Sequence, residues 1–304
     1  MSWKPEDELD IIAGTPPGGG LDRSARALAA AITANKLVPV PIKVVNVGGD
    51  GGRKAWVHMA ERAGNPHVVG ISSPNMAADY LMGVTKTDPE HFPPIAILYS
   101  EYIAFVVRTE SSLRSGNDLV RRLADSPRSI KIALSTSLGN SNHVAVAKVI
   151  RHAEVDIKVP NIRVFDTALD AVADVAAGHA DVGAITAASP IPELAAGRLR
   201  AIGISSKARV GGPYAATPTW HEQGVDCVIG SWRGVSGAPG INHEQIAFWQ
   251  SVLAATIKTE EWKSDLVRHF WTEMYLEGEK LHAYLKHERA EMRGVLDGLG
   301  LLHG

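Results

Sequence analysis

Short apolar runs rich in Val and Ile alternate along the chain with segments of helical periodicity, a pattern typical of βαβ units. Apolar side chains between Leu21 and Ile32, for example, fall on one face of a helix. The apolar runs predict strands at Leu9–Ala13, Ile42–Val45, Val68–Ser72, Ile95–Leu98, Tyr102–Val107, Ile130–Leu134, Asp181–Ile185 and Leu199–Ile204. The sequence therefore predicts an α/β fold with mainly parallel sheets.

Two glycines mark a near-repeat of a helix followed by a strand. Gly178 follows a helix predicted at Ala171–Ala177, and Gly197 follows one predicted at Glu193–Ala196. Glycine just after a helix adopts the left-handed cap without steric cost, so both residues are expected to end their helices.

The last part of the chain, from Asn242 on, is predicted to be helical almost throughout. Asn242 and Gln245 have the spacing of a capping box, with Asn in place of the usual Ser or Thr. Three tryptophans in this region, Trp249, Trp262 and Trp271, are interpreted as core residues.

Composition excludes some classes of protein. Of 304 residues, 45% are hydrophobic and 21% charged, and the net charge is −2, which fits a folded protein with a core and gives no footprint for nucleic acid. No apolar run approaches the roughly 18–20 residues that cross a bilayer. The first residues, Met1–Asp7, lack an apolar signal region, so an exported protein would have lost its signal from this sequence. The single cysteine, Cys227, is expected to be a small buried hydrophobe.

The first candidate functional segment is a turn rich in proline and glycine between a predicted strand and a predicted helix, Gly14–Asp22. Glycines let a ligand approach the main chain, and the helix behind them offers free N–H groups to an anion. The turn is not a phosphate-binding Walker loop, because no Lys-Ser/Thr follows Gly19. An ordinary tight turn, with Asp22 in the first helical turn, explains the same residues equally well.

The second segment, Ser135–His143, also lies between a predicted strand and a predicted helix. It holds several hydroxyls, two amides and one imidazole, and can surround an anion with neutral donors. A plain polar loop with a helix cap at Ser141 or Asn142 is the alternative. A nucleophilic Ser–His pair is disfavoured, because Ser141 does not sit in a Gly-x-Ser-x-Gly elbow.

Ser72 and Ser73, at the end of another predicted strand, form a third candidate. In open parallel sheets ligands sit beyond the carboxyl ends of strands, where all three segments fall, so a single cleft is expected. The scattered histidines show no metal-binding spacing, and no cofactor or metal site is predicted. Asp181 and Arg233 are isolated charges near strand ends, more typical of ion pairs than of ligand contacts.

Several motifs together resemble the receptors of tripartite tricarboxylate transporters, the Bug family of TctC-like periplasmic solute-binding proteins. The motifs occur in the family's order between about Ile11 and Pro239: Pro16–Asp22 followed by Ala25-Arg26, Val45–Gly52, Gly139–His143, Ala195–Gly203, Thr217–Thr219, Glu222–Gly224 and Ser231–Gly234. Each is weak alone, but the ordered set is specific.

The resemblance implies a two-lobed fold like that of periplasmic binding proteins of type II, each lobe a mixed sheet flanked by helices, with a ligand cleft between the lobes. Residues 1–100 and 222–304 would form lobe 1, and residues 101–221 lobe 2. The implied ligand contacts are Pro17, Gly18, Gly19, Gly20, Leu21 and Asp22 in lobe 1 and Thr136, Ser137, Gly139, Asn140 and His143 in lobe 2, with Ser72, Ser73 and Asp181 as second-rank candidates.

The implied function is capture of a small organic acid, a dicarboxylate or an aromatic acid, by lobes that close like a flytrap and deliver it to membrane subunits. Such a protein would be periplasmic, monomeric and without catalytic activity. Leu21 departs from the Thr or Ser common in the family, and Asp50 adds a charge to the second glycine turn, so an aromatic or longer-chain acid is expected. A ligand sensor and, less favoured, a Ser/His hydrolase are the alternatives.

Overall fold

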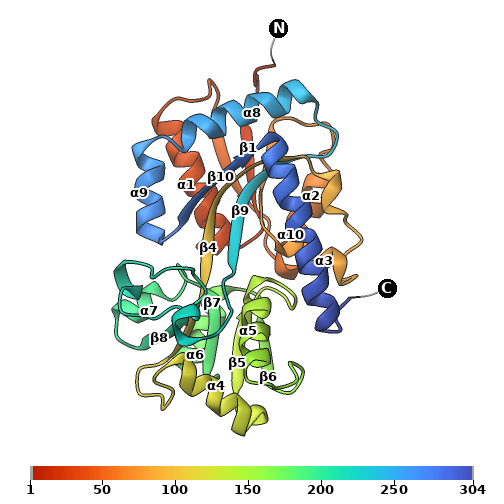
Figure 1. Cartoon of the computed structure of the whole chain (residues 1–304). Helices are drawn as coiled ribbons and strands as arrows, with labels where there is room; N and C mark the ends of the chain where they lie inside the picture. Colours follow the sequence, from red (N-terminus) through yellow and green to blue (C-terminus); the bar gives the residue numbers. More distant parts are fainter. Residues whose placement is uncertain (1–2, 303–304) are drawn as a thin grey trace. The chain divides into compact units, whose positions relative to one another are not determined.

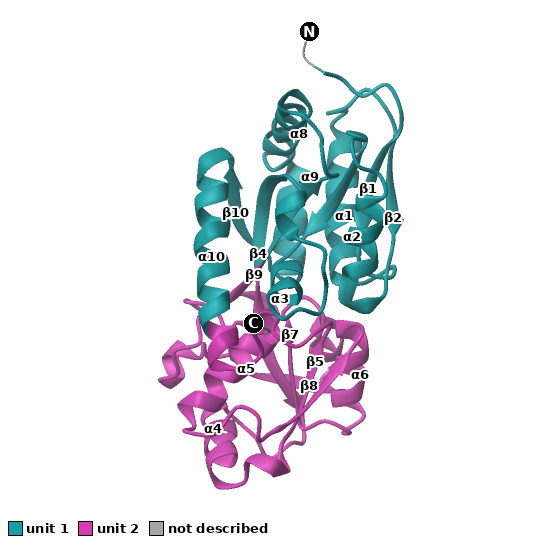
Figure 2. Cartoon of the chain, turned by 90° about the vertical axis from the view of Figure 1, so that its right-hand side faces the viewer, with its two compact units in different colours: residues 1–100, 232–294, 303 teal, residues 101–231, 295–302, 304 magenta. Residues whose placement is uncertain are grey.

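The computed structural model describes residues 3–302, and its internal contacts divide them into two compact units (Figure 2). Unit 1 holds residues 3–100 and 232–294, and unit 2 holds residues 101–231 and 295–302. The second boundary between the units thus falls near residue 231, whereas the sequence places it near residue 221. The end of the chain, expected in lobe 1, belongs to unit 2. Residues 1–2 and 303–304, the outer ends of the expected first lobe, lie outside the described residues.

The sheet of unit 1 combines parallel and antiparallel pairs (Figure 1). Its strands follow the order β2 (Ile42–Asn46), β1 (Leu9–Ala13), β3 (Val68–Ser72), β9 (Gly230–Gly237), β4 (Pro94–Arg108) and β10 (Thr272–Glu277). β1 pairs in parallel with β2 and β3, whereas β9 and β10 run antiparallel to their neighbours β3 and β4. The carboxyl ends of β1 and β3 therefore lie at one edge.

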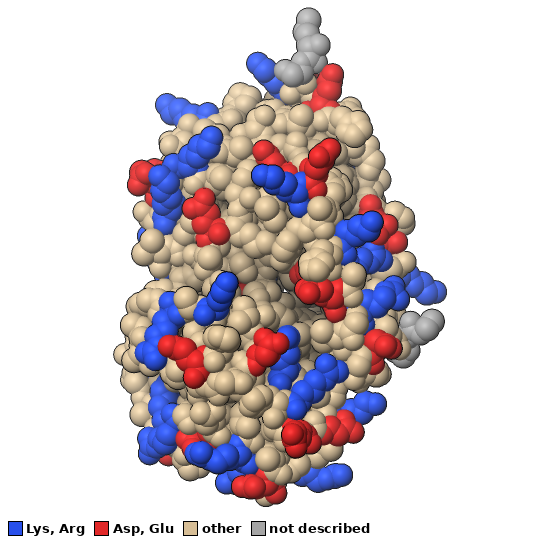
Figure 3. Space-filling view, viewed as in Figure 1, with Lys and Arg blue, Asp and Glu red and all other residues tan. Residues whose placement is uncertain are grey.

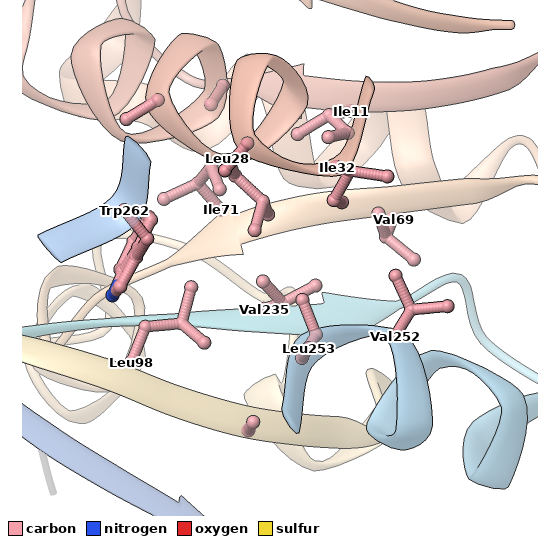
Figure 4. Close-up of a cluster of buried hydrophobic side chains, with 14 of the residues drawn as sticks. Ile11, Leu28, Ile32, Val69, Ile71, Leu98, Val235, Val252, Leu253 and Trp262 are labelled. Carbon is pink, nitrogen blue, oxygen red and sulfur yellow. The ribbon is translucent and has the colours of Figure 1, made fainter. Parts of the chain in front are cut away.

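A large apolar core lies between this sheet and the helices α1 (Gly20–Ala34), α8 (His243–Thr256) and α9 (Glu260–His269). Leu28 and Ile32 of α1 point toward Ile71 and Val69 of β3, as Figure 4 shows. Each such fully buried side chain stabilises the fold by about 1.5–3 kcal/mol. This packing fixes α1, and with it the loop that precedes α1. The remaining helical segments of unit 1 are α2 (Arg53–Ala60), α3 (Asn75–Leu81), η1 (Asp50–Gly52), η2 (Pro89–His91) and most of α10 (Gly278–Gly298).

Unit 2 is built around a second mixed sheet. β5 (Lys131–Ser135) pairs in parallel with β6 (Asn161–Phe165) and β7 (Val182–Thr186), and β4 runs antiparallel to β7 and β8 (Leu199–Ile204). The helices are α4 (Gly116–Asp125), α5 (Ser141–His152), α6 (Ala168–Ala176) and α7 (Ile191–Ala195), with short η3 (Pro127–Ser129), η4 (Gly212–Tyr214) and η5 (His221–Gln223). Because β5 and β7 are parallel, the loops after them leave the same edge of the sheet.

Several local predictions are confirmed and others are wrong. Gly178 and Gly197 adopt positive φ angles, 78° and 69°, directly after their helices. The capping box at Asn242 is formed, with the Gln245 side chain accepting from the Asn242 N–H. The two strands predicted between residues 95 and 107 are one strand, β4, because polar residues near Glu101 interrupt the apolar pattern without ending the strand. The strand β10 lies in a region predicted to be helical, and β6 and β9 were not predicted.

The face of the molecule in Figure 3 shows acidic and basic side chains intermixed. Across residues 3–302, no helix combines the length and apolar character needed to span a membrane. Cys227 is buried as expected, and burial raises the pKa of its thiol to about 12.

Candidate functional site

The loop between β1 and α1 is organised around the carboxylate of Asp22. Asp22 is 2% exposed. It accepts hydrogen bonds from the backbone N–H of Gly18 at 2.7 Å, from Arg26 Nε at 2.9 Å and from Asn46 Nδ2 at 2.8 Å. Burial alone would raise the pKa of Asp22, but the bonds from Arg26, Asn46 and Gly18 outweigh it and lower the pKa. Asp22 is therefore an ionised positioning residue that holds the glycine loop.

The side chain of Thr15 completes this loop, because its hydroxyl accepts from the Asp22 N–H at 3.1 Å. A Cβ added to Gly19 would lie 2.6 Å from the Thr15 Cβ, so the turn has room only for glycine there. Within the described chain, the N–H groups of Gly20 and Leu21 donate to no protein acceptor. Two donors at the positive end of a 15-residue helix thus remain available to an anion.

Leu21 contributes an apolar side chain to the same turn. It is half-buried and packs against the main core of unit 1. In the neighbouring glycine turn, the charge of Asp50 lies 3.9 Å from Lys54 Nζ, and both side chains are exposed. The two charges of this pair therefore offset each other, while at the first loop the Arg23 guanidinium donates to the Gly18 carbonyl at 2.9 Å.

The loop between β5 and α5 is also held by a buried polar network. Asn140 caps α5 by accepting from the His143 N–H at 3.1 Å. The Asn140 amide donates to the Ser135 carbonyl at 2.7 Å and to Thr136 Oγ1 at 2.8 Å. Asn142 donates to Ser135 Oγ at 2.9 Å. The amides predicted as ligand donors therefore serve first to shape the loop.

His143 is 5% exposed, and its Nδ1 accepts the backbone N–H of Gly139 at 2.9 Å. Because Nδ1 is an acceptor, the ring proton of the neutral form resides on Nε2, which can donate to a ligand. Burial lowers the pKa of His143 to about 4, so the ring is neutral at physiological pH.

Further donors surround the start of α5. The N–H groups of Ser141 and Asn142 have no protein acceptor among residues 3–302, as expected for the first turn of a helix. Ser137 is 9% exposed, and its Oγ forms no hydrogen bond with the described residues. An unsatisfied buried hydroxyl is costly unless a ligand or water meets it. The loop therefore offers neutral donors to an anion.

Ser72 ends β3 and Ser73 follows it, and both are buried in unit 1, at 6% and 8% exposure. Both line a cavity of about 730 Å³ whose other walls come from unit 1 alone. The residues Gly14–Asp22 do not line this cavity, and contact of the two serines with a ligand at the first loop stays a prediction.

Asp181 is placed by the structure far from the second loop. It precedes β7, and its carboxylate accepts from the N–H of Lys131, the first residue of β5, at 2.8 Å. The loop Thr136–His143 follows the opposite, carboxyl end of β5. The suggestion that Asp181 contacts a ligand there is corrected, because its carboxylate ties together the amino ends of two strands.

Sequence reasoning missed the segment after β7, Ala187–Ser189. This segment leaves the same sheet edge as the second loop, and the Ala188 N–H donates to the buried carboxylate of Glu101 at 3.2 Å. The Ala187 carbonyl accepts from the Tyr214 hydroxyl at 2.5 Å. Burial, together with Glu101, raises the pKa of Tyr214 far above its ordinary value. The position of Thr186-Ala-Ala-Ser189 after an apolar strand was the available signal.

The arrangement expected of a Ser/His hydrolase is not formed by these residues. No hydrogen bond joins His143 to Ser137 or Ser141 in the described chain, and the Nδ1 that an orienting carboxylate would hold is engaged by a backbone N–H. A ring with a pKa near 4 is also a weak general base. Among residues 3–302, no cluster of His, Cys, Asp or Glu is able to hold a metal ion.

Comparison with solved structures decides the fold. An R. palustris protein whose structure was solved with adipate superposes with a TM-score of 0.88 at 20% identity, covering 97% of this chain and 98% of that chain. The periplasmic binding protein BugD gives a TM-score of 0.85 at 16% identity over 98% and 99% of the two chains. The chain has the fold of the TctC and Bug solute-binding proteins. A TctC solute-binding protein from Polaromonas matches with a TM-score of 0.70 at 24% identity over 96% and 99%.

A curated relative carries the same resemblance in sequence. A UPF0065 protein of Pseudomonas sp. strain P51, from a tcbD–tcbE intergenic region, is 26% identical over 205 residues, which is 66% of this chain. The match spans 59% of that relative's length. No protein-family model matches the chain. The similar structures are solute-binding proteins, so the two-lobed fold expected from the sequence motifs is confirmed.

Proposed function

We propose that the chain is an extracytoplasmic solute receptor that binds a small organic carboxylate and delivers it to the membrane subunits of a tripartite tricarboxylate-type transporter. The observation that supports this most is that two loops, one in each unit, share one design. Each follows a parallel strand, is braced by a buried polar network, and leaves two helix N–H groups without an acceptor among residues 3–302. Because the chain has the fold of solute-binding proteins, we interpret these two loops as its ligand contacts.

One carboxylate of the ligand would accept from the N–H groups of Gly20 and Leu21 in unit 1. The other end of the ligand would meet the Ser141 and Asn142 N–H groups, Ser137 Oγ and His143 Nε2 in unit 2. All these donors are neutral, so binding an anion requires no protonation of the protein. Hydrogen bonds to a charged partner are worth about 1.5–3 kcal/mol each, so a few suffice for micromolar affinity.

The ligand class is proposed to be a dicarboxylate or an aromatic acid, with a preference for a longer or aromatic body. Leu21 is an apolar residue in the same turn as the first pair of donors. Compared with the Thr or Ser common in the family, it offers the ligand no hydroxyl but an apolar contact for a carbon body. Among the similar structures, one was solved with adipate, a dicarboxylate with a four-methylene body. Engagement of both loops by one ligand would favour a closed state over an open one, in proportion to the difference in affinity.

A thermal-shift screen against aliphatic and aromatic acids tests the proposal. A ligand present at about 100 times its dissociation constant adds roughly 2.7 kcal/mol to the stability of the folded state. We expect one class of carboxylate to raise the melting temperature while no product forms. His143→Ala should abolish the shift, whereas the control His152→Ala, an exposed residue at the end of the same helix, should keep it. Turnover of an ester of the bound acid would instead support the hydrolase.

A sensor of the same acids has the same binding site, so partner capture separates the two roles. The ligand-loaded protein should bind membranes that contain the transporter subunits, and the unloaded protein should bind them weakly. Equal binding with and without ligand would contradict delivery. A single boundary of monomer mass in sedimentation is expected in both conditions.

A further inference from the structure

The cavity of unit 1 lies beneath α10 and is unused by the proposed function. Its volume, about 730 Å³, falls within the range of roughly 300–1,000 Å³ that holds small molecules. Most of its wall is apolar, with Trp56, Met76, Phe92, Val235, Leu281 and Leu285 among the lining residues. Trp56 and Phe92 meet edge to face, with ring centroids 5.0 Å apart. An apolar body of several carbon atoms fits these walls.

The rim of the cavity is basic. His282, Lys286, Arg289 and Arg293 recur along α10 at intervals of three or four residues and all line the cavity, so they share one flank of the helix. Arg289 forms an ion pair with Glu90, and its Cζ lies 5.4 Å from the ring centroid of Tyr80. Lys286 and Arg293 are exposed, and neither pairs with an acidic group in the described chain. Two cations therefore line the cavity without a counter-ion from residues 3–302.

The other acidic group of the wall, Glu288, does not supply that counter-ion. Its Oε1 accepts from the indole N–H of Trp232 at 2.6 Å. Burial raises the pKa of Glu288 to about 7, with Glu291 adding to the rise, although the bond from Trp232 opposes it. Because Glu90 is already paired, the cavity carries an excess of positive charge.

We propose that the cavity beneath α10 is a ligand site for an amphipathic organic acid, whose apolar body fills the cavity and whose carboxylate pairs with Lys286 and Arg293. The site goes beyond the proposed function, because no residue of the loops Gly14–Asp22 or Ser135–His143 lines it. It requires the opposite chemistry from those loops: a large apolar surface with cationic side chains at one end. Ser72, Ser73 and Ser236 add the few hydroxyls of the wall.

Calorimetric titration of the whole protein with straight-chain monocarboxylates, from butanoate to decanoate, tests the site. Each buried methylene contributes about 0.8 kcal/mol, so affinity should rise about fourfold per methylene until the cavity is full. The double variant Lys286→Gln, Arg293→Gln should weaken decanoate binding by at least about tenfold, because it removes both charge-assisted bonds. The matched control Lys258→Gln, Lys280→Gln makes the same charge change at residues of unit 1 that do not line the cavity and should bind as the parent does.

A cavity-filling variant gives an independent test. Ala290 lines the cavity from an exposed position on α10, so Ala290→Trp can occupy the space while the helix stays folded. It should abolish decanoate binding with the melting temperature unchanged within a few degrees. Affinity that does not depend on chain length, or that survives in both Ala290→Trp and the double glutamine variant, would overturn the proposal. Short dicarboxylates should bind the double variant as tightly as the parent, which separates this site from the loops.

Discussion

Replacement of His143 by alanine perturbs stability in a way that depends on pH, because the ring is buried in the neutral form. In the folded protein burial lowers the pKa of His143 to about 4, against 6.5 for an ordinary histidine. The unfolded chain thus binds a proton near pH 6.5 and the folded chain only near pH 4. Stability from the neutral ring is fully present above pH 6.5 and is lost as the pH falls through the folded pKa.

The size of the effect follows from the two pKa values. Between about pH 8 and about pH 5, the proton taken up by the unfolded chain destabilises the parent by about 2 kcal/mol through this one residue. The alanine variant lacks this change. It suffers a second loss that does not depend on pH: the N–H of Gly139 loses its acceptor, Nδ1, which costs about 1–3 kcal/mol, together with a term for the cavity.

Urea unfolding of both proteins, followed by circular dichroism from about pH 5 to about pH 8, measures the difference directly. We expect the parent to be more stable than His143→Ala by several kcal/mol near pH 8 and the gap to shrink by about 2 kcal/mol near pH 5. Taking the difference between the two proteins cancels the remaining histidines. A gap that stays constant over this range would refute the buried neutral ring. Nitrogen chemical shifts should show the proton on Nε2.

Three further outcomes are expected. Asp22→Asn should lower the free energy of unfolding by about 2 kcal/mol near pH 7, because it removes the charge that Arg26 and the Gly18 N–H stabilise. The difference in stability from the parent should close at acidic pH, because Asp22 becomes protonated in the parent. Glu288→Gln should stabilise the protein by up to about 3 kcal/mol above pH 7 and little near pH 5, because a carboxyl with a raised folded pKa destabilises the fold once it ionises; a pH series of melting temperatures checks this. Gly19→Ala should weaken carboxylate binding at least about tenfold in calorimetry, because its Cβ would lie 2.6 Å from Thr15 and must displace the loop; unchanged affinity would show that the loop does not hold the ligand.

Local patterns predicted much of the fold. The strands at Leu9–Ala13, Val68–Ser72 and Leu199–Ile204 have the bounds expected from the sequence, because each is an apolar run closed by polar or turn residues. β10 was missed because Thr272–Glu277 is half polar and lies on an exposed edge, where no face needs to be uniformly apolar. β4 was divided in two because the buried Glu101 interrupts its apolar pattern, and tertiary contacts such as the bond from the Ala188 N–H stabilise that burial.

The candidate site, like the fold, was predicted only in part from the sequence. The donor-rich composition of Ser135–His143 is visible in sequence, as is its place after a strand. That His143 accepts from Gly139 and that Asp22 binds Asn46 depend on side-chain geometry, which spacing does not specify. The cavity beneath α10 could not be predicted, because its walls combine residues as far apart along the chain as Trp56 and Leu285.

The tryptophans of this chain are distributed unequally between the two units, so the units contribute unequally to its intrinsic fluorescence. Six of the seven lie in the sequence ranges of unit 1 and one, Trp220, lies in unit 2. Trp271 stacks on Tyr99 with ring centroids 4.0 Å apart, and Trp262 lies 6.2 Å from Trp271, close enough to share excitation energy. Intrinsic emission of this protein therefore reports chiefly on unit 1. A variant whose six other indoles are replaced by phenylalanine would make Trp220, fully buried against Phe105, a reporter of unit 2 alone.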